Sequence, residues 1–132
     1  MSILKKLIQS ENDAREFGFD WPDPFMVLDQ IIDECREIRD EINQGSNQEK
    51  LQEEIGDLFH AAISLCIFSG FDLEQTLEKT NLKFSKRMML VKALAKNKGL
   101  KDLRGQNIDF MLSLWKEAKK LESSRDFIEG KK

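Results

Sequence analysis

A chain of 132 residues has room for one ordinary folded domain and too little for two independent catalytic domains. Hydrophobic residues make up 40% and charged residues 34% of it, with only 7 Gly and 2 Pro. This balance suits charged helices around an apolar core and argues against a β-sandwich or a disordered chain. We therefore expect an all-α protein, an antiparallel bundle of about four to five helices forming a single domain over residues 1–132.

Targeting signals and disulfide patterns are not apparent in the chain. No apolar run approaches the roughly 18 residues that a membrane span needs, and the N-terminal segment lacks the apolar core of a signal peptide. Cys35 and Cys66 lie inside apolar helical patterns without the spacing of a zinc site, so we interpret them as reduced core thiols. We expect a cytoplasmic protein with no membrane and no nucleic-acid partner.

Charge is distributed unevenly along the chain, although the net charge is only −3. Residues 11–57 hold 15 acidic against 4 basic residues, whereas residues 79–104 hold 9 basic residues against 1 acidic residue. Apolar residues recur at helical spacing within both blocks, which is not typical of a charged tail. The pattern predicts acidic and basic helices that could face one another.

The first two predicted helices have clear end signals. The first runs from about Ile3 to Phe17 and ends at a glycine. Asp23 can cap the second helix, and proline suits its first position, where the missing N–H costs nothing. That second helix runs from about Pro24 to Gln44, and Gly45 provides its C-terminal stop.

The later helices are predicted in the same way. The third runs over about 47–69, and its second half is apolar nearly all round, which places that half in the centre of a bundle. A capping box of Asp72 and Gln75 begins the fourth, which continues to about Asn97. The fifth covers about 108–121, and we expect the tail from about residue 123 to fray.

Acidic side chains flank the apolar stripes of the second and third helices. Glu34, Glu37 and Glu41 fall within roughly 60° of one another, and Glu54 and Asp57 share an equivalent flank. Like charges at this spacing repel, and near a core they lose hydration, so the arrangement is unfavourable without a cation. In an antiparallel hairpin the two flanks could converge and bind Mg²⁺ or Mn²⁺. The alternative is a solvated acidic face.

The fourth helix supplies basic and amide side chains. Lys83 and Arg87 lie one turn apart beside its apolar stripe, where they could neutralise polyphosphate oxygens. Simple salt bridges to the acidic helices are the alternative. Asn81 falls within the stripe, where an amide needs hydrogen-bond partners.

Two motifs carry a family resemblance. DECRE over 33–37 and EEIGD over 53–57 resemble the E-E-x-x-E and E-E-x-x-D pair of MazG-type nucleotide pyrophosphohydrolases, with Asp33 in place of the first Glu. The stretches FGFDWPDP, EEIGDLFHAAISL, TNLKFSKRM and LWKEAKKLE are also similar to parts of MazG catalytic domains. The resemblance covers the chain from about Phe17 to Glu122. The N-terminal helix matches weakly, and we expect it to serve packing alone.

The resemblance implies an activity and a set of site residues. The activity is Mg²⁺-dependent hydrolysis of an NTP or dNTP to the monophosphate and pyrophosphate, with Mn²⁺ as a substitute and the metal activating a water. The implied metal ligands are Glu34, Glu37, Glu54 and Asp57. The implied substrate contacts are Lys83 and Arg87 at the phosphates, Trp115 near the base, and Asn81. The general base stays open among Glu53, Glu37 and Glu41.

Several alternatives stay open at this point. The substrate could be narrower, such as dCTP, dUTP or a phosphoribosyl nucleotide, and the chain could instead be a noncatalytic helical interaction module. We expect at least a homodimer, because the apolar third helix with Phe68, Phe71 and the Met88–Met89 pair exceeds what one thin bundle can cover. His60, the only histidine, lacks an evident catalytic partner, and we interpret it as structural.

Overall fold

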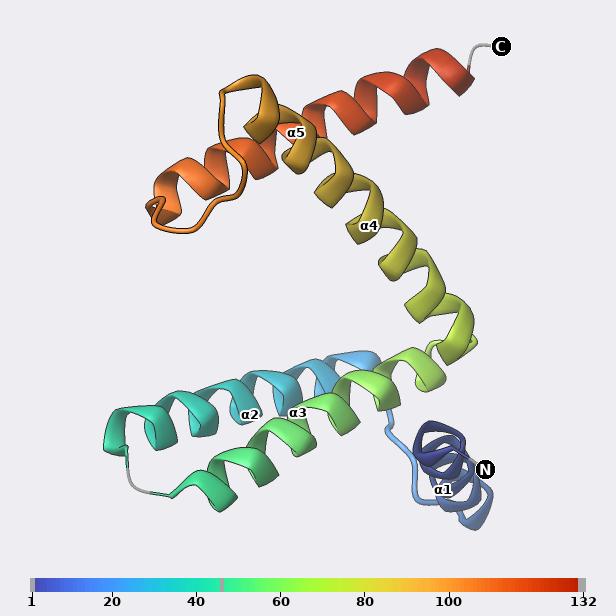
Figure 1. The fold of residues 1–132 in the computed structure, drawn as a ribbon. Helices are drawn as coiled ribbons and strands as arrows, with labels where there is room; N and C mark the ends of the chain where they lie inside the picture. The colour runs from blue at the N-terminus through green and yellow to red at the C-terminus, as the bar shows by residue number, and fades with distance from the viewer. Residues whose placement is uncertain (1, 46, 131–132) are drawn as a thin grey trace. The chain divides into compact units, whose positions relative to one another are not determined.

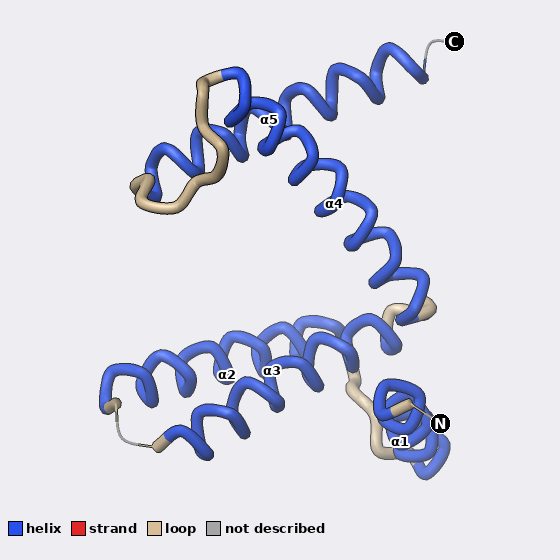
Figure 2. Tube along the Cα trace, in the orientation of Figure 1, coloured by secondary structure: helices blue, strands red, loops and turns tan. Residues whose placement is uncertain are grey.

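The computed structural model describes residues 2–45 and 47–130, with side chains described for 2–45 and 47–124. Figure 2 shows helices and loops, without strands, in that part of the chain. The helices are α1 (Ile3–Phe17), α2 (Pro24–Gln44), α3 (Gln48–Phe68), α4 (Leu73–Asn97) and α5 (Ile108–Gly130), in this order (Figure 1). The predicted all-α fold is confirmed.

Local hydrogen bonds explain why the helices begin where they do. The Asp23 carboxylate accepts the backbone N–H of Met26 at 3.0 Å, and Pro24 takes the first position of α2. Asn47 and Asp72 cap α3 and α4 in the same manner, each through its side-chain oxygen. Gly45 ends α2 with a φ of 66°, a left-handed conformation that a side chain would disfavour.

The helices α2 and α3 run side by side in opposite directions (Figure 1), and only three positions of the chain separate the end of α2 from the start of α3. This is the antiparallel hairpin that the sequence predicted for them. The predicted packing of α4 as a further antiparallel neighbour stays a prediction. The hairpin matters because it sets the acidic flanks of its two helices against each other.

The chain divides into two compact units, which we call the N-terminal unit (Met1–Thr76) and the C-terminal unit (Leu77–Lys132). In the N-terminal unit, α1 is held to α3 by hydrogen bonds from Arg15 to the Ser64 backbone carbonyl and from the Ser64 hydroxyl to Glu11. In the C-terminal unit, the end of α4 packs against α5 around a core of Val91, Ala95, Leu114 and Ala118.

Burial and helix length depart from expectation in three places. Cys35 is exposed and Cys66 only half-buried, so the prediction of two core thiols is wrong for Cys35. Among the described residues of α3 only Ala61 and Ser64 are buried, and large apolar side chains such as Phe59 are exposed. The helix α5 continues to Gly130, well beyond its predicted end, since no helix breaker precedes that glycine. Positions 131–132 of the tail that we expected to fray lie outside the described residues.

Across the described residues, no single helix combines the length and the apolar composition needed to cross a membrane.

Candidate active site

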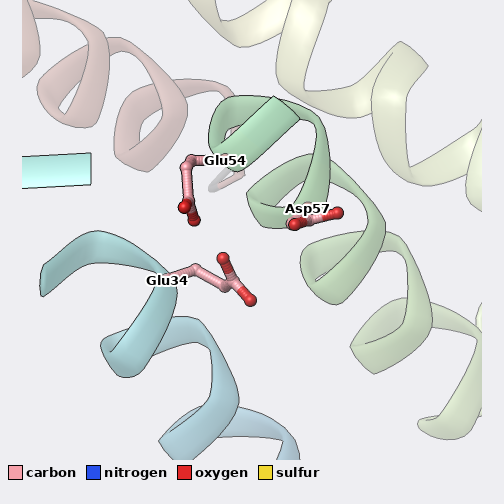
Figure 3. A group of neighbouring side chains, drawn as sticks. All are labelled: Glu34, Glu54 and Asp57. Atoms are coloured by element: carbon pink, nitrogen blue, oxygen red, sulfur yellow. The ribbon is translucent and has the colours of Figure 1, made fainter. Parts of the chain in front are cut away.

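Three acidic side chains from α2 and α3 converge at the hairpin. Glu34 projects from α2 toward Glu54 and Asp57, which lie one turn apart on α3 (Figure 3). One carboxylate oxygen from each residue lies within 4.8 Å of those from the other two. We call these three residues the carboxylate cluster. Glu34 is buried, Glu54 is half-buried and Asp57 is exposed, so the cluster opens toward solvent on one side.

The geometry of the carboxylate cluster fits a small divalent cation. Ligand oxygens about 2.1 Å from one Mg²⁺ lie no more than about 4.2 Å apart. The observed separations are at most 4.8 Å, so small side-chain rotations suffice to bring all three oxygens into one coordination sphere. Carboxylate oxygens without nitrogen or sulfur are the donors that Mg²⁺ and Mn²⁺ prefer.

Glu34 shows most clearly that the cluster is suited to a ligand. Its side chain is only 7% exposed, and its Oε1 accepts a hydrogen bond from Gln30 Nε2 at 2.8 Å. Its other oxygen, Oε2, is buried without a hydrogen-bond partner among the described residues. Burial, followed by repulsion from Glu37, raises the pKa of this carboxyl group. A buried acceptor of this kind is costly unless a proton or a cation satisfies it.

Glu37, the fourth predicted ligand, lies against the cluster rather than inside it. Hydrogen bonding with the Glu37 carboxyl group, with burial and the charges of Glu37 and Glu34, raises the pKa of Glu54 to about 7. The positive charge of the nearby Lys50 lowers the pKa of Glu54 and so offsets part of this rise.

The two remaining candidates for the general base have different surroundings. Glu41 is 6% exposed, and its Oε2 lies 3.6 Å from Lys50 Nζ, so it is already neutralised by an ion pair. Glu53 is exposed on α3, outside the carboxylate cluster. Their roles stay predictions.

A pocket of about 670 Å³ adjoins the carboxylate cluster, with Glu34 and Asp57 in its wall. We call it the α1 pocket, because α1 supplies one side of it through residues such as Leu7, Glu11 and Arg15. Trp21 and other residues of the loop before α2 also line it. Its volume lies in the range of small-molecule sites. This pocket was not predicted from the sequence, from which α1 was expected to serve packing alone.

Polar side chains of α1 and α3 are joined across the α1 pocket. Ser64, which is 4% exposed, accepts a hydrogen bond from Trp21 Nε1 at 3.0 Å and donates one to Glu11 at 3.2 Å. Arg15 donates to the backbone carbonyl of Ser64 at 3.0 Å, and His60 pairs with Glu11. His60 thus pairs with an acidic side chain of α1, and both residues line the pocket. Its structural role stays a prediction.

In the C-terminal unit, Arg87 and Trp115 are brought together. The Arg87 guanidinium carbon lies 5.6 Å from the centre of the Trp115 ring, and its Nε donates to Glu122 at 2.7 Å. Lys83 and Asn81 are exposed, with no hydrogen bond or ion pair to other residues that the structure describes. Asn81 was expected on an apolar face, but its side chain is exposed to solvent.

Comparison with known proteins matches this arrangement to a family. The model of the MazG nucleotide pyrophosphohydrolase domain matches residues 24–91, which include α2, α3, Lys83 and Arg87. A nucleoside triphosphate pyrophosphohydrolase of Escherichia coli is 34% identical over 123 residues, covering 92% of this chain and 46% of that protein. The nucleoside triphosphate pyrophosphohydrolase/pyrophosphatase MazG of Thermotoga maritima is 31% identical over 109 residues, or 83% of this chain and 41% of that protein. The chain spans less than half the length of these relatives.

Proposed function

Because the chain belongs to the family of MazG nucleotide pyrophosphohydrolase domains, we propose that it hydrolyses nucleoside triphosphates to the monophosphate and pyrophosphate. The observation that carries this proposal is the convergence of Glu34, Glu54 and Asp57 around a buried, unpartnered carboxylate oxygen. The two relatives described above carry names for this activity, which supports the same reaction here.

The residues of the carboxylate cluster would hold Mg²⁺, with Glu37 as the fourth acidic side chain at its edge. Bound there, the cation would neutralise charge on the substrate's phosphate oxygens as it develops during hydrolysis. The chain's own contribution is to fix the carboxylates on two rigid helices and to orient Glu34 through Gln30. This preorganised charge is the main source of catalysis expected in phosphoryl chemistry.

The α1 pocket supports a nucleotide as the substrate rather than a simple polyphosphate. It adjoins Glu34 and Asp57, so a substrate whose phosphates lie at the cluster can extend its nucleoside into the pocket. Trp21 offers an aromatic face and the Glu11, His60 and Ser64 group offers polar contacts in its wall. The contact of the base with Trp115 that the sequence predicted is the alternative to binding in the α1 pocket. The predicted phosphate and substrate contacts Lys83, Arg87 and Asn81 stay predictions.

We further propose that the enzyme works as a homodimer. Large apolar side chains of the N-terminal unit lie at the surface, among them Phe25 at 72%, Phe59 at 67% and Ile42 at 60% exposure. Exposed apolar surface on both helices of one hairpin is typical of an interface. Light scattering at micromolar concentration should give twice the mass of one chain, and a monomer mass would contradict the dimer.

The experiment that tests the activity is a panel of NTPs, dNTPs and modified nucleotides, assayed for pyrophosphate release with Mg²⁺, with Mn²⁺ and with EDTA. We expect metal-dependent release from at least one nucleoside triphosphate. Release from dCTP or dUTP alone would point to the narrower enzyme, and turnover of a phosphoribosyl nucleotide alone would redirect the substrate class. No release above the rate of a Glu54→Gln variant would leave a noncatalytic interaction module as the better interpretation.

A further inference from the structure

The Arg87 side chain is held from two directions within the C-terminal unit. Its Nε donates to Glu122 Oε2 at 2.7 Å, and its guanidinium carbon lies 5.6 Å from the centre of the Trp115 ring. Phe84 packs against the same ring, with 5.9 Å between ring centres. The side chains of Arg87 and Glu122 are only 20% and 15% exposed, so this is a partly buried ion pair and not an ordinary surface contact.

These contacts use one edge and one face of the guanidinium. Of its five N–H donors, Glu122 occupies the one on Nε. No acceptor for the four N–H groups on the two Nη atoms is found among the side chains that the structure describes, residues 2–45 and 47–124. The edge formed by the two Nη atoms presents parallel donors that can form paired hydrogen bonds with phosphate oxygens.

We propose that Glu122 is a positioning residue, which orients Arg87 so that its Nη edge receives a phosphate group of the substrate. This inference rests on the proposed function, because it takes Arg87 to be a phosphate contact. An arginine held in one orientation loses less side-chain freedom when it binds, and so binds phosphate more tightly. The carboxylate repels an incoming phosphate only weakly, since Arg87 already neutralises it.

The test compares substitutions of Glu122 that keep or remove the acceptor. Glu122→Ala should raise the KM for the best nucleotide by about tenfold, the effect of losing one charge-assisted hydrogen bond. Glu122→Gln keeps an oxygen for the Nε donor, and should stay within about threefold of the wild type. Glu117→Ala on the same helix, exposed and outside the pair, is the matched control and should leave KM unchanged.

A double-mutant cycle separates positioning from a general structural role. If Glu122 acts through Arg87, Glu122→Ala should have no further effect on KM once Arg87→Ala is present. Additive effects in the cycle, an unchanged KM, or tighter binding in Glu122→Ala would each overturn the proposal. Should Glu122→Ala fail to fold, Glu122→Asp keeps the charge but shortens the reach, and should raise KM in the same direction.

Binding of inorganic tripolyphosphate with Mg²⁺, measured by calorimetry on the full chain, gives a readout that does not depend on turnover. We expect Glu122→Ala to weaken this binding by about the same tenfold factor as KM. A wild type that hydrolyses nucleotides but shows no Glu122 effect would remove the positioning role and leave the proposed function standing. If the wild type showed no turnover but Glu122→Ala still weakened tripolyphosphate binding only when Arg87 was present, the positioning role would stand and the proposed function would fall.

Discussion

The two compact units of the chain differ in how their charged side chains are arranged. In the N-terminal unit, the carboxylate cluster brings like charges together, and the pKa values of Glu34 and Glu54 are raised. In the C-terminal unit, Arg87 is already paired with Glu122 and lies against Trp115. Like charges gathered beside a core favour a cation or a proton by their own chemistry, whereas a satisfied ion pair is equally consistent with a purely structural role.

This difference decides how strongly each unit supports a function by itself. A buried Glu34 oxygen without a described partner is a direct physical argument for a ligand. The assignment of Arg87 to phosphate depends on the family, because the one hydrogen bond that the structure gives its side chain, from Nε to Glu122, needs no substrate. Substitutions in the two units should therefore differ in kind, and the following predictions measure that difference.

The largest effect is expected from Glu54→Gln. Losing one charged ligand from a hard-cation site should lower turnover by at least about a thousandfold. In metal-free buffer the same variant should melt at a higher temperature than the wild type, because one repelling charge is gone. Melting curves with EDTA and with Mg²⁺, beside pyrophosphate release, check both statements. Glu49→Gln, an exposed acid on the same helix, is the control and should behave like the wild type.

Near-normal turnover in Glu54→Gln would remove this residue from the site and weaken the metal assignment as a whole. The metal assignment would also be weakened if Mg²⁺ did not change the melting temperature of the wild type, even with nucleotide present. A ligand that binds only the folded state must stabilise it.

A smaller effect is expected from Arg87→Ala in the other unit. Loss of a phosphate contact should reduce kcat/KM by about a hundredfold. The stabilisation of the protein by Mg²⁺ alone should be unchanged, because the carboxylate cluster is intact. Steady-state kinetics and melting curves on one preparation give both quantities. If Arg87→Ala kept full kcat/KM, the ion pair of Arg87 with Glu122 would be structural, and only the N-terminal unit would contribute to activity.

The pH dependence of stability provides a further test of the N-terminal unit. The pKa of Glu54 is raised from 4.5 to about 7 in the folded protein, so between these pH values the folded state binds more protons than the unfolded state. The metal-free protein should therefore lose stability as pH rises from about 5 to about 7.5. Mg²⁺ should oppose this loss, because it replaces the proton. Melting temperatures across this range, for wild type and Glu54→Gln, should show a shallower slope in the variant.

Helix boundaries and the approach of the acidic flanks could be predicted from the sequence because both depend on local rules. Asp23 and Gly45 mark helix ends through their own backbone and side-chain preferences. Once α2 and α3 form a hairpin, helical spacing alone brings Glu34 to Glu54 and Asp57.

The α1 pocket could not be predicted because it depends on contacts between distant positions. Glu11 and Arg15 meet Ser64 from about fifty residues away in the chain, and no periodicity connects them. His60 lacked a predicted partner for the same reason, since Glu11 lies on α1. Cys35 shows the opposite error: helical spacing placed it on an apolar stripe, but a stripe becomes a core only where another surface covers it.

The smallest predicted effect compares one serine from each unit. Ser64 is buried, accepts the Trp21 N–H and donates to Glu11, so Ser64→Ala leaves a buried donor and a carboxylate without their partner. This should lower the free energy of unfolding by about 1 to 2 kcal/mol. Ser113 is exposed on α5 and donates only to the Phe110 carbonyl of its own helix. Ser113→Ala should be neutral or slightly stabilising, because alanine favours the helix and no buried group loses a partner.

Urea unfolding measures both serine variants, with the midpoint shifted for Ser64→Ala and the slope m unchanged. Because Ser64 holds Trp21 in the wall of the α1 pocket, its variant should also raise the KM for nucleotide, whereas the Ser113 variant should not. Equal effects of the two substitutions on unfolding would show that the side-chain network between α1 and α3 is not selectively stabilising. A Ser64→Ala protein with reduced stability but an unchanged KM would keep the network as a structural feature and remove the pocket from the nucleotide site.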